Sequence, residues 1–136
     1  MTRKGPRKTV DTTYWPARLK QARAYLEAAK QALILAEPGQ SANPAISHIV
    51  LAAIAYGDCL TAKRARLINQ QDHAAAPKLL REVLRDTLPA EQERHYRRIL
   101  AEKDGAQYGA RPAKLEHARR LLATLEEFAR WAEEQL

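Results

Sequence analysis

The sequence has little of what holds small disulfide-rich domains or β-sheets together. Cys59 is the single cysteine, which excludes an internal disulfide and a cluster of thiolate metal ligands. Aromatic residues make up only 6% of the chain, and strand-forming residues are scarce. Ala, Leu, Glu, Gln, Arg and Lys dominate instead, and these residue types favour helix. We therefore expect an all-α protein that is soluble and located in a reducing cytoplasm.

Long hydrophobic runs are also missing. The longest mostly apolar stretch covers residues 46–56, well short of the roughly 20 residues that a membrane span requires. The first ten residues contain no apolar core of a signal peptide. A length of 136 residues suits one domain, which we place at residues 13–136.

Acidic residues are absent from the first ten positions, although the chain carries a net charge of +7. Those positions hold Arg3, Lys4, Arg7 and Lys8. A basic arm can contact phosphates and gain affinity by releasing counterions, but unconstrained termini are commonly disordered. We expect residues 1–12 to form a disordered basic arm, with an arm that binds nucleic acid as the alternative.

Apolar residues recur at spacings of three and four along the rest of the chain, which is the period of a helix. The expected helices cover about residues 15–36, 44–69, 73–86 and 89–104, with a last one opening at Arg111-Pro112. The second has the broadest apolar face, so we expect it at the centre, with Gly57 letting a neighbouring backbone approach closely. Short connections favour antiparallel neighbours. The predicted fold is an up-and-down bundle of four to five antiparallel helices.

Few residue patterns in this bundle point to chemistry. The four histidines, His48, His73, His95 and His117, are never four positions apart, so no two share a helix face as metal ligands would. No phosphate-binding glycine loop and no Ser or Cys nucleophile motif occur. We expect no catalytic residue, no metal and no cofactor.

Two charged positions lie at the edges of apolar stripes. Asp58 is close to the apolar face of the second helix, and Lys103-Asp104 continues the stripe of the fourth. Burying a charged side chain is costly, so a charge at the edge of a core indicates either an ion-pair partner or a function. A salt bridge or a snorkelling lysine is the simpler interpretation, and a functional site is the alternative.

Two segments of the chain resemble parts of one known family. The first is residues 48–63, from His48-Ile49-Val50 through Tyr56-Gly57-Asp58 to Ala62-Lys63, followed by Asp72-His73 and Lys78-Leu79-Leu80. The second is Lys103-Asp104-Gly105-Ala106-Gln107-Tyr108-Gly109, with Leu125-Glu126-Glu127-Phe128-Ala129 after it. They look like the second helix with its following turn and the last two elements of HEPN-domain proteins, small helical bundles of prokaryotic toxins and of partners of minimal nucleotidyltransferases. The resemblance covers most of the chain from about Pro44 onward.

The resemblance implies a binding site more than an active site. Ribonuclease members of the family carry an Arg, a polar residue just after it and then a His, whereas this chain has Lys103 and Tyr108 in place of the Arg and the His. The candidate binding residues are Lys103, Asp104, Tyr108, Asp58 and Lys63. Two other pairs match the ribonuclease motif by spacing alone, Arg66 with His73 and Arg111 with His117.

Three hypotheses follow from the sequence. The first is a non-catalytic HEPN-like binding or regulatory module, with a nucleotidyltransferase partner or with RNA or nucleotide as its ligand. The second is a metal-independent ribonuclease of the toxin type, and the third is a structural or protein-interaction bundle. We also expect a homodimer, because the first and last helices carry broad apolar faces with Trp15, Tyr25 and Trp131, and because the family commonly dimerises.

Overall fold

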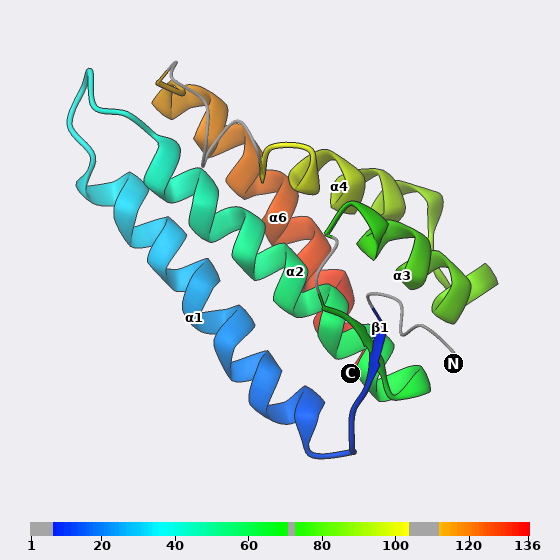
Figure 1. The fold of residues 1–136 in the computed structure, drawn as a ribbon. Coiled ribbons are helices and arrows are strands. Elements are labelled where there is room, and N and C mark those ends of the chain that lie inside the picture. Colours follow the sequence, from blue (N-terminus) through cyan, green and yellow to red (C-terminus); the bar gives the residue numbers. More distant parts are fainter. Residues whose placement is uncertain (1–6, 71–72, 104–111) are drawn as a thin grey trace, which may run out of the picture.

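Helices dominate the computed structural model, which describes residues 7–70, 73–103 and 112–136 (Figure 1). In chain order its elements are β1 (Arg7–Thr9), α1 (Tyr14–Leu35), α2 (Asn43–Ala65), β2 (Leu67–Asn69), α3 (Ala76–Leu84), α4 (Ala90–Leu100) and α6 (Leu115–Gln135). Short 3-10 turns, His73–Ala75 and Arg85–Thr87, flank α3. The predicted all-α helical bundle is confirmed.

The central element is α2, as its broad apolar face predicts. It lies between α1 on one side and α6, α3 and α4 on the other (Figure 1). Its residues from Ala52 to Ala62 are all buried, because neighbours cover it on every side. With 23 residues it is also long and apolar enough to cross a membrane, but 83% of its most apolar window is buried within the protein. Burial in the bundle therefore accounts for its apolar composition.

Contacts at both ends show that α2 and α6 run in the same direction. At their start, the backbone N–H of Ala42 donates to the carbonyl of Ala113 at 3.0 Å, and the N–H of Ala113 donates to Asn43 Oδ1 at 2.9 Å. At their end, Lys63 Nζ donates to the carbonyl of Leu136. Between them, α3 and α4 lead the chain back to the end of the bundle where α2 begins, and α6 starts there (Figure 1). The short connection at residues 36–42 makes α1 and α2 antiparallel.

The second helix is shorter than predicted. It ends at Ala65, and Arg66 adopts a left-handed conformation with φ of 55°, from which its N–H donates back to the carbonyl of Ala62 at 2.9 Å. Residues 67–69 then form β2, an antiparallel strand on β1 in which Lys8 pairs with Ile68. The prediction of a helix to residue 69 is wrong because the left-handed residue redirects the backbone out of the helix.

The same pairing corrects the prediction for the N-terminal arm. Arg7–Thr9 is a strand with a ladder partner, and the N–H of Val10 donates to the carbonyl of Arg66 at 3.0 Å. A disordered arm over residues 1–12 is therefore wrong for this part, because backbone hydrogen bonds tie it to β2. Residues 1–6 lie outside the described residues.

A single glycine positions α4 against α2. A Cβ added at Gly57 would lie 2.8 Å from Cζ of Tyr96, whose ring is buried and stacks on Phe128 at a centroid distance of 5.1 Å. The predicted close approach is present, but the neighbour is a tyrosine side chain and not a backbone.

The apolar faces that predicted a dimer are largely used within one chain. Ala22, Ala29 and Leu33 of α1 are buried, and α6 buries the residues of its stripe, Ala118, Leu121, Leu125, Phe128, Ala129 and Ala132. The large apolar residues left exposed in the described part of the chain are Ile34 and Leu35 at the end of α1.

Candidate functional site

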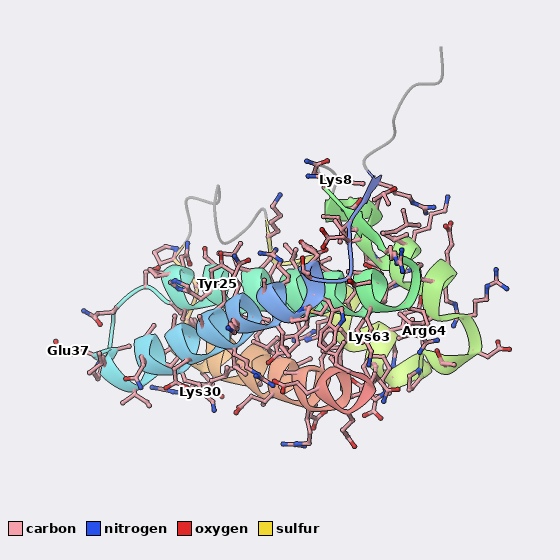
Figure 2. All side chains as sticks on the ribbon, turned by 90° about the horizontal axis from the view of Figure 1, so that it is seen from below. Lys8, Tyr25, Lys30, Glu37, Lys63 and Arg64 are labelled. Carbon is pink, nitrogen blue, oxygen red and sulfur yellow. The ribbon has the colours of Figure 1, made fainter. Side chains whose placement is uncertain are left out.

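Arginines from three separate segments meet at the end of the bundle where α2 stops. β1 contributes Arg7, the last turn of α2 contributes Arg64, and Arg85 follows α3. They line one hollow of about 580 Å³, in which Glu82 is the one acidic residue among the described lining residues. We call the surface formed by Arg7, Arg64 and Arg85 the basic end. Figure 2 shows Arg64 near Lys63 at this end of the molecule.

The local backbone explains why these side chains converge. Arg66, in its left-handed conformation, sends the chain from α2 into β2, and β2 in turn pairs with β1 so that Arg7 lies opposite Asn69. Arg85 also has a positive φ, of 51°, and ends α3 beside the same hollow. Two residues in uncommon backbone conformations therefore border the basic end.

The charges of the basic end are only partly compensated. Arg7 Nη2 lies 2.5 Å from Glu82 Oε2, whereas Arg64 Nη1 donates to the hydroxyl of Thr87 at 3.3 Å. Arg85 Nε donates to the carbonyl of Glu82 at 3.4 Å. The described lining thus has one carboxylate and three guanidinium groups, and two of these three groups donate to neutral partners. The hollow keeps a net positive charge and has donors that can reach an anion.

Lys63, a candidate binding residue, adjoins this surface. Its Nζ lies 5.2 Å from the centroid of the Trp15 ring and donates to the carbonyl of Leu136. Lys63 and Arg64 together line a second hollow of about 390 Å³ against the C-terminus. The structure therefore places Lys63 beside the basic end, where its cation also packs against an aromatic face.

Asp58, another candidate, lies beneath α1 and not at the basic end. Its Oδ2 is 3.2 Å from Arg18 Nε and 3.1 Å from Arg18 Nη2, and only 9% of its side chain is exposed. Burial raises the pKa of Asp58 to about 6, although the Arg18 guanidinium acts in the opposite direction. The salt bridge expected for Asp58 is confirmed. Arg18 also lines a hollow of about 590 Å³ together with Lys8 and Tyr14.

A second charged cluster fastens three helices to one another. Glu133 of α6 receives Arg23 Nη2 at 2.6 Å and the hydroxyl of Tyr56 at 2.8 Å. These hydrogen bonds, led by that from Arg23, lower the pKa of Glu133, and burial raises the pKa of Tyr56. Sequence reasoning missed this cluster, although Glu133 follows Ala129 by four positions and so continues the buried stripe of α6.

The group suggested by the resemblance is described only in part. Lys103 is half-buried just beyond α4, and Asp104 and Tyr108 lie outside the described residues. Asp58 pairs with Arg18 of α1, whereas Lys103 follows the end of α4. A shared site of Lys103, Asp104 and Tyr108 therefore stays a prediction.

Each of the two pairs matched by spacing includes a residue whose side chain lies outside the described part of the chain. Arg66 is exposed and serves with its backbone as the cap of α2, and His73 begins a 3-10 turn. His117 Nε2 contacts the Glu102 carboxylate, and Arg111 falls within the undescribed stretch 104–111. Both pairs remain predictions.

Arg7 stands out in the sequence among the basic residues of the first ten positions, whereas neither Arg64 nor Arg85 stands out. Arg64 stands next to the candidate Lys63 in the last turn of a helix, where a basic residue has a sufficient reason in the helix dipole. Arg85 is far from Arg7 along the chain, and no local pattern links the two. Their proximity depends on the β1–β2 pairing, which the sequence did not reveal.

Comparison of the chain with protein-family models gives no match, and a search of curated proteins gives none either. The resemblance to HEPN-domain proteins consequently rests on the residues quoted for it.

Proposed function

We propose that this chain is a non-catalytic binding module that holds RNA by its phosphates at the basic end. The observation that carries the proposal is the convergence of Arg7, Arg64 and Arg85 on one hollow from three elements. Arginine presents a planar fork of donors that matches two phosphate oxygens at once. Three such groups beside a single carboxylate in one described lining favour a polyanion over a neutral ligand.

The composition of the hollow supports binding without cleavage. Among its described lining residues there is no His, Tyr, Ser or Cys, and Glu82 is held by Arg7. A group that moves protons in phosphodiester cleavage needs a pKa near the working pH and reach to the reacting oxygen. Arginine stays protonated at all relevant pH values, so it can stabilise phosphate charge but cannot act as a base.

The resemblance to HEPN-domain proteins adds the biological setting of the proposal. A HEPN-like regulatory module of the cytoplasm, working beside a nucleotidyltransferase, would use such a surface to hold RNA or nucleotide. The lysine and tyrosine at positions 103 and 108 agree with a binding role, because a phenol with a reference pKa of about 10 is protonated near neutral pH and is a poor base.

The test is fluorescence anisotropy with a labelled single-stranded RNA, measured over a series of salt concentrations. The double variant Arg64→Ala, Arg85→Ala should bind at least about tenfold more weakly at moderate salt. Its slope of log affinity against log salt should fall by about 1.4, since each lost phosphate contact on a single strand removes about 0.7. The charge-matched control is Arg119→Ala, Arg130→Ala, which removes two exposed arginines of α6.

Equal losses in the two double variants would contradict a site at the basic end. A labelled DNA of the same sequence shows whether recognition goes beyond phosphate.

The recovered RNA should also be intact on a denaturing gel. Cleavage that disappears in Lys103→Ala, Tyr108→Ala would overturn the non-catalytic assignment in favour of the ribonuclease hypothesis.

A further inference from the structure

Three potential metal ligands converge on the side of the bundle where α4 packs on α6. Glu91 and His95 are four positions apart on α4, and Glu127 comes from α6. One ligand atom of each lies within 4.8 Å of the other two. His95 Nε2 is 3.5 Å from Glu127 Oε2 and 4.0 Å from Glu91 Oε1.

These separations fit a metal site better than they fit hydrogen bonds. A charge-assisted N–H···O bond brings nitrogen and oxygen to about 2.7–2.9 Å. Zinc ligands at about 2.05 Å in a regular tetrahedron are instead about 3.3 Å apart. The His95–Glu127 distance is close to that edge, and rotation of the Glu91 side chain, which is 64% exposed, can close the remaining gap.

The other ring nitrogen of His95 has a partner of its own. Nδ1 lies 3.2 Å from Gln92 Oε1, an acceptor. The tautomer with its proton on Nδ1 donates to this oxygen and leaves the Nε2 lone pair for a metal ion held between the two carboxylates. Histidines that bind metals almost always donate their second N–H in this way, which fixes the ring and its tautomer. The ring is held further by its surroundings, since only 17% of the His95 side chain is exposed.

We propose that Glu91, His95 and Glu127 form a binding site for a late first-row divalent cation, with Zn²⁺ as the representative ion. One imidazole nitrogen and two carboxylate oxygens suit zinc, and a fourth position stays open for water or another ligand. Mg²⁺ and Ca²⁺ fit poorly, because they prefer oxygen ligands and higher coordination numbers than three side chains supply.

Such an ion would cross-link α4 and α6. α4 is the shorter helix of the pair, at 11 residues against 21, and the site lies near its first turns. Metal bound to the folded chain stabilises it by mass action, because the three ligands are not assembled in the unfolded chain. The sequence pattern that marks the site is the Glu91–His95 spacing, which a search for paired histidines passes over.

The experiment uses the full-length, tag-free chain after removal of metal with a chelator. Isothermal titration with Zn²⁺ should show one site per chain, and Zn²⁺ at ten times the dissociation constant should raise Tm by about 4 °C. Mg²⁺ should do neither. His95→Gln and Glu127→Gln should each weaken Zn²⁺ binding by more than about tenfold, the loss that even outer-shell changes cause at metal sites.

The matched control is His117→Gln, which removes another histidine in contact with a glutamate, Glu102, but leaves the three ligands in place. It should bind Zn²⁺ like the wild type. Co²⁺ supplies a second readout, because a tetrahedral site gives it an intense visible spectrum that His95→Gln should abolish. Wild-type protein that binds no Zn²⁺, or His95→Gln protein that folds and binds it equally well, would overturn the proposal.

Discussion

Burial of the Asp58 carboxylate costs desolvation free energy, which the ion pair with Arg18 only partly offsets. The two side chains are 9% and 20% exposed, and desolvation outweighs the attraction of the guanidinium in setting the pKa of Asp58. A buried ion pair of this kind is weak evidence for stability, because both charges leave water. Its clearer effect is geometric, since it fixes the position of α1 on α2.

The raised pKa of Asp58 predicts a definite pH dependence. In the unfolded chain its pKa is near 3.8, and in the folded chain it is about 6, so between these values the folded state binds the extra proton. The free energy of unfolding therefore falls as pH rises from about 4 to about 6, by up to about 3 kcal/mol from this group. Above pH 6 its contribution is constant.

Chemical denaturation of wild type and Asp58→Asn at several pH values measures this effect. The stability advantage of the wild type over the variant should shrink between pH 4 and pH 7. Asp86→Asn, a change at an exposed aspartate, should show no comparable trend. A wild-type advantage that stays constant over this range would contradict the assigned environment of Asp58.

At the scale of the elements, the packing of α4 on α2 depends on the missing side chain at Gly57. Helix propensity alone predicts that Gly57→Ala stabilises the chain by about 1 kcal/mol. The added methyl would lie 2.8 Å from Cζ of Tyr96, a buried ring stacked on Phe128 that has little room to move. Overpacking typically costs about 1–3 kcal/mol, so we expect a net loss of about 1 kcal/mol.

Thermal or urea unfolding decides between the two effects by the sign of the change. Introducing the substitution into a Tyr96→Phe background should lessen the loss, because the hydroxyl that approaches Gly57 is then absent. A more stable Gly57→Ala protein would show that α4 can shift without cost.

The elements that the sequence could predict are those with a long periodic signal. The four-and-three spacing along α1, α2 and α6 repeats over several turns and identified each helix. β1 and β2 have three residues each, too few for any period, and they pair only because Arg66 leaves the helix in a left-handed conformation. Arg rarely adopts a left-handed conformation, so the residue type at position 66 does not predict one.

The candidate site also contains some residues that a local sequence pattern indicates and others that only the tertiary structure brings together. Lys63 is a candidate because it lies in the segment that carries the family resemblance. Arg7, Arg64 and Arg85 instead form one surface only through the strand pairing and the turn after α3. Glu91 and Glu127 belong to different helices, and their approach to His95 depends on how α4 docks on α6. Local patterns locate helices, but contacts between distant segments need the tertiary structure.

At the scale of the whole molecule, α1 and α6 bury against α2 much of the apolar surface from which a dimer is expected. Among the described residues, the large apolar side chains left exposed for self-association are Ile34 and Leu35 at the end of α1, at 73% and 75%. A two-fold contact would bury this pair from each copy, four aliphatic side chains in all. At about 1.5–3 kcal/mol each, they would contribute about 6–12 kcal/mol, similar to the estimated cost of association, 4–15 kcal/mol or more.

We therefore expect a weak homodimer that depends on concentration and not a permanent one. Each copy carries a net charge of +7, so repulsion opposes the contact and added salt should strengthen it. In sedimentation or light scattering the mean mass should rise from 15.3 kDa toward twice that value as the protein is concentrated. Ile34→Glu, Leu35→Glu should remain at 15.3 kDa, whereas Gln31→Glu, an exposed charge change nearby on α1, should still associate. A monomeric wild type at every concentration and salt would contradict the prediction, and association that survives the double variant would place the contact elsewhere.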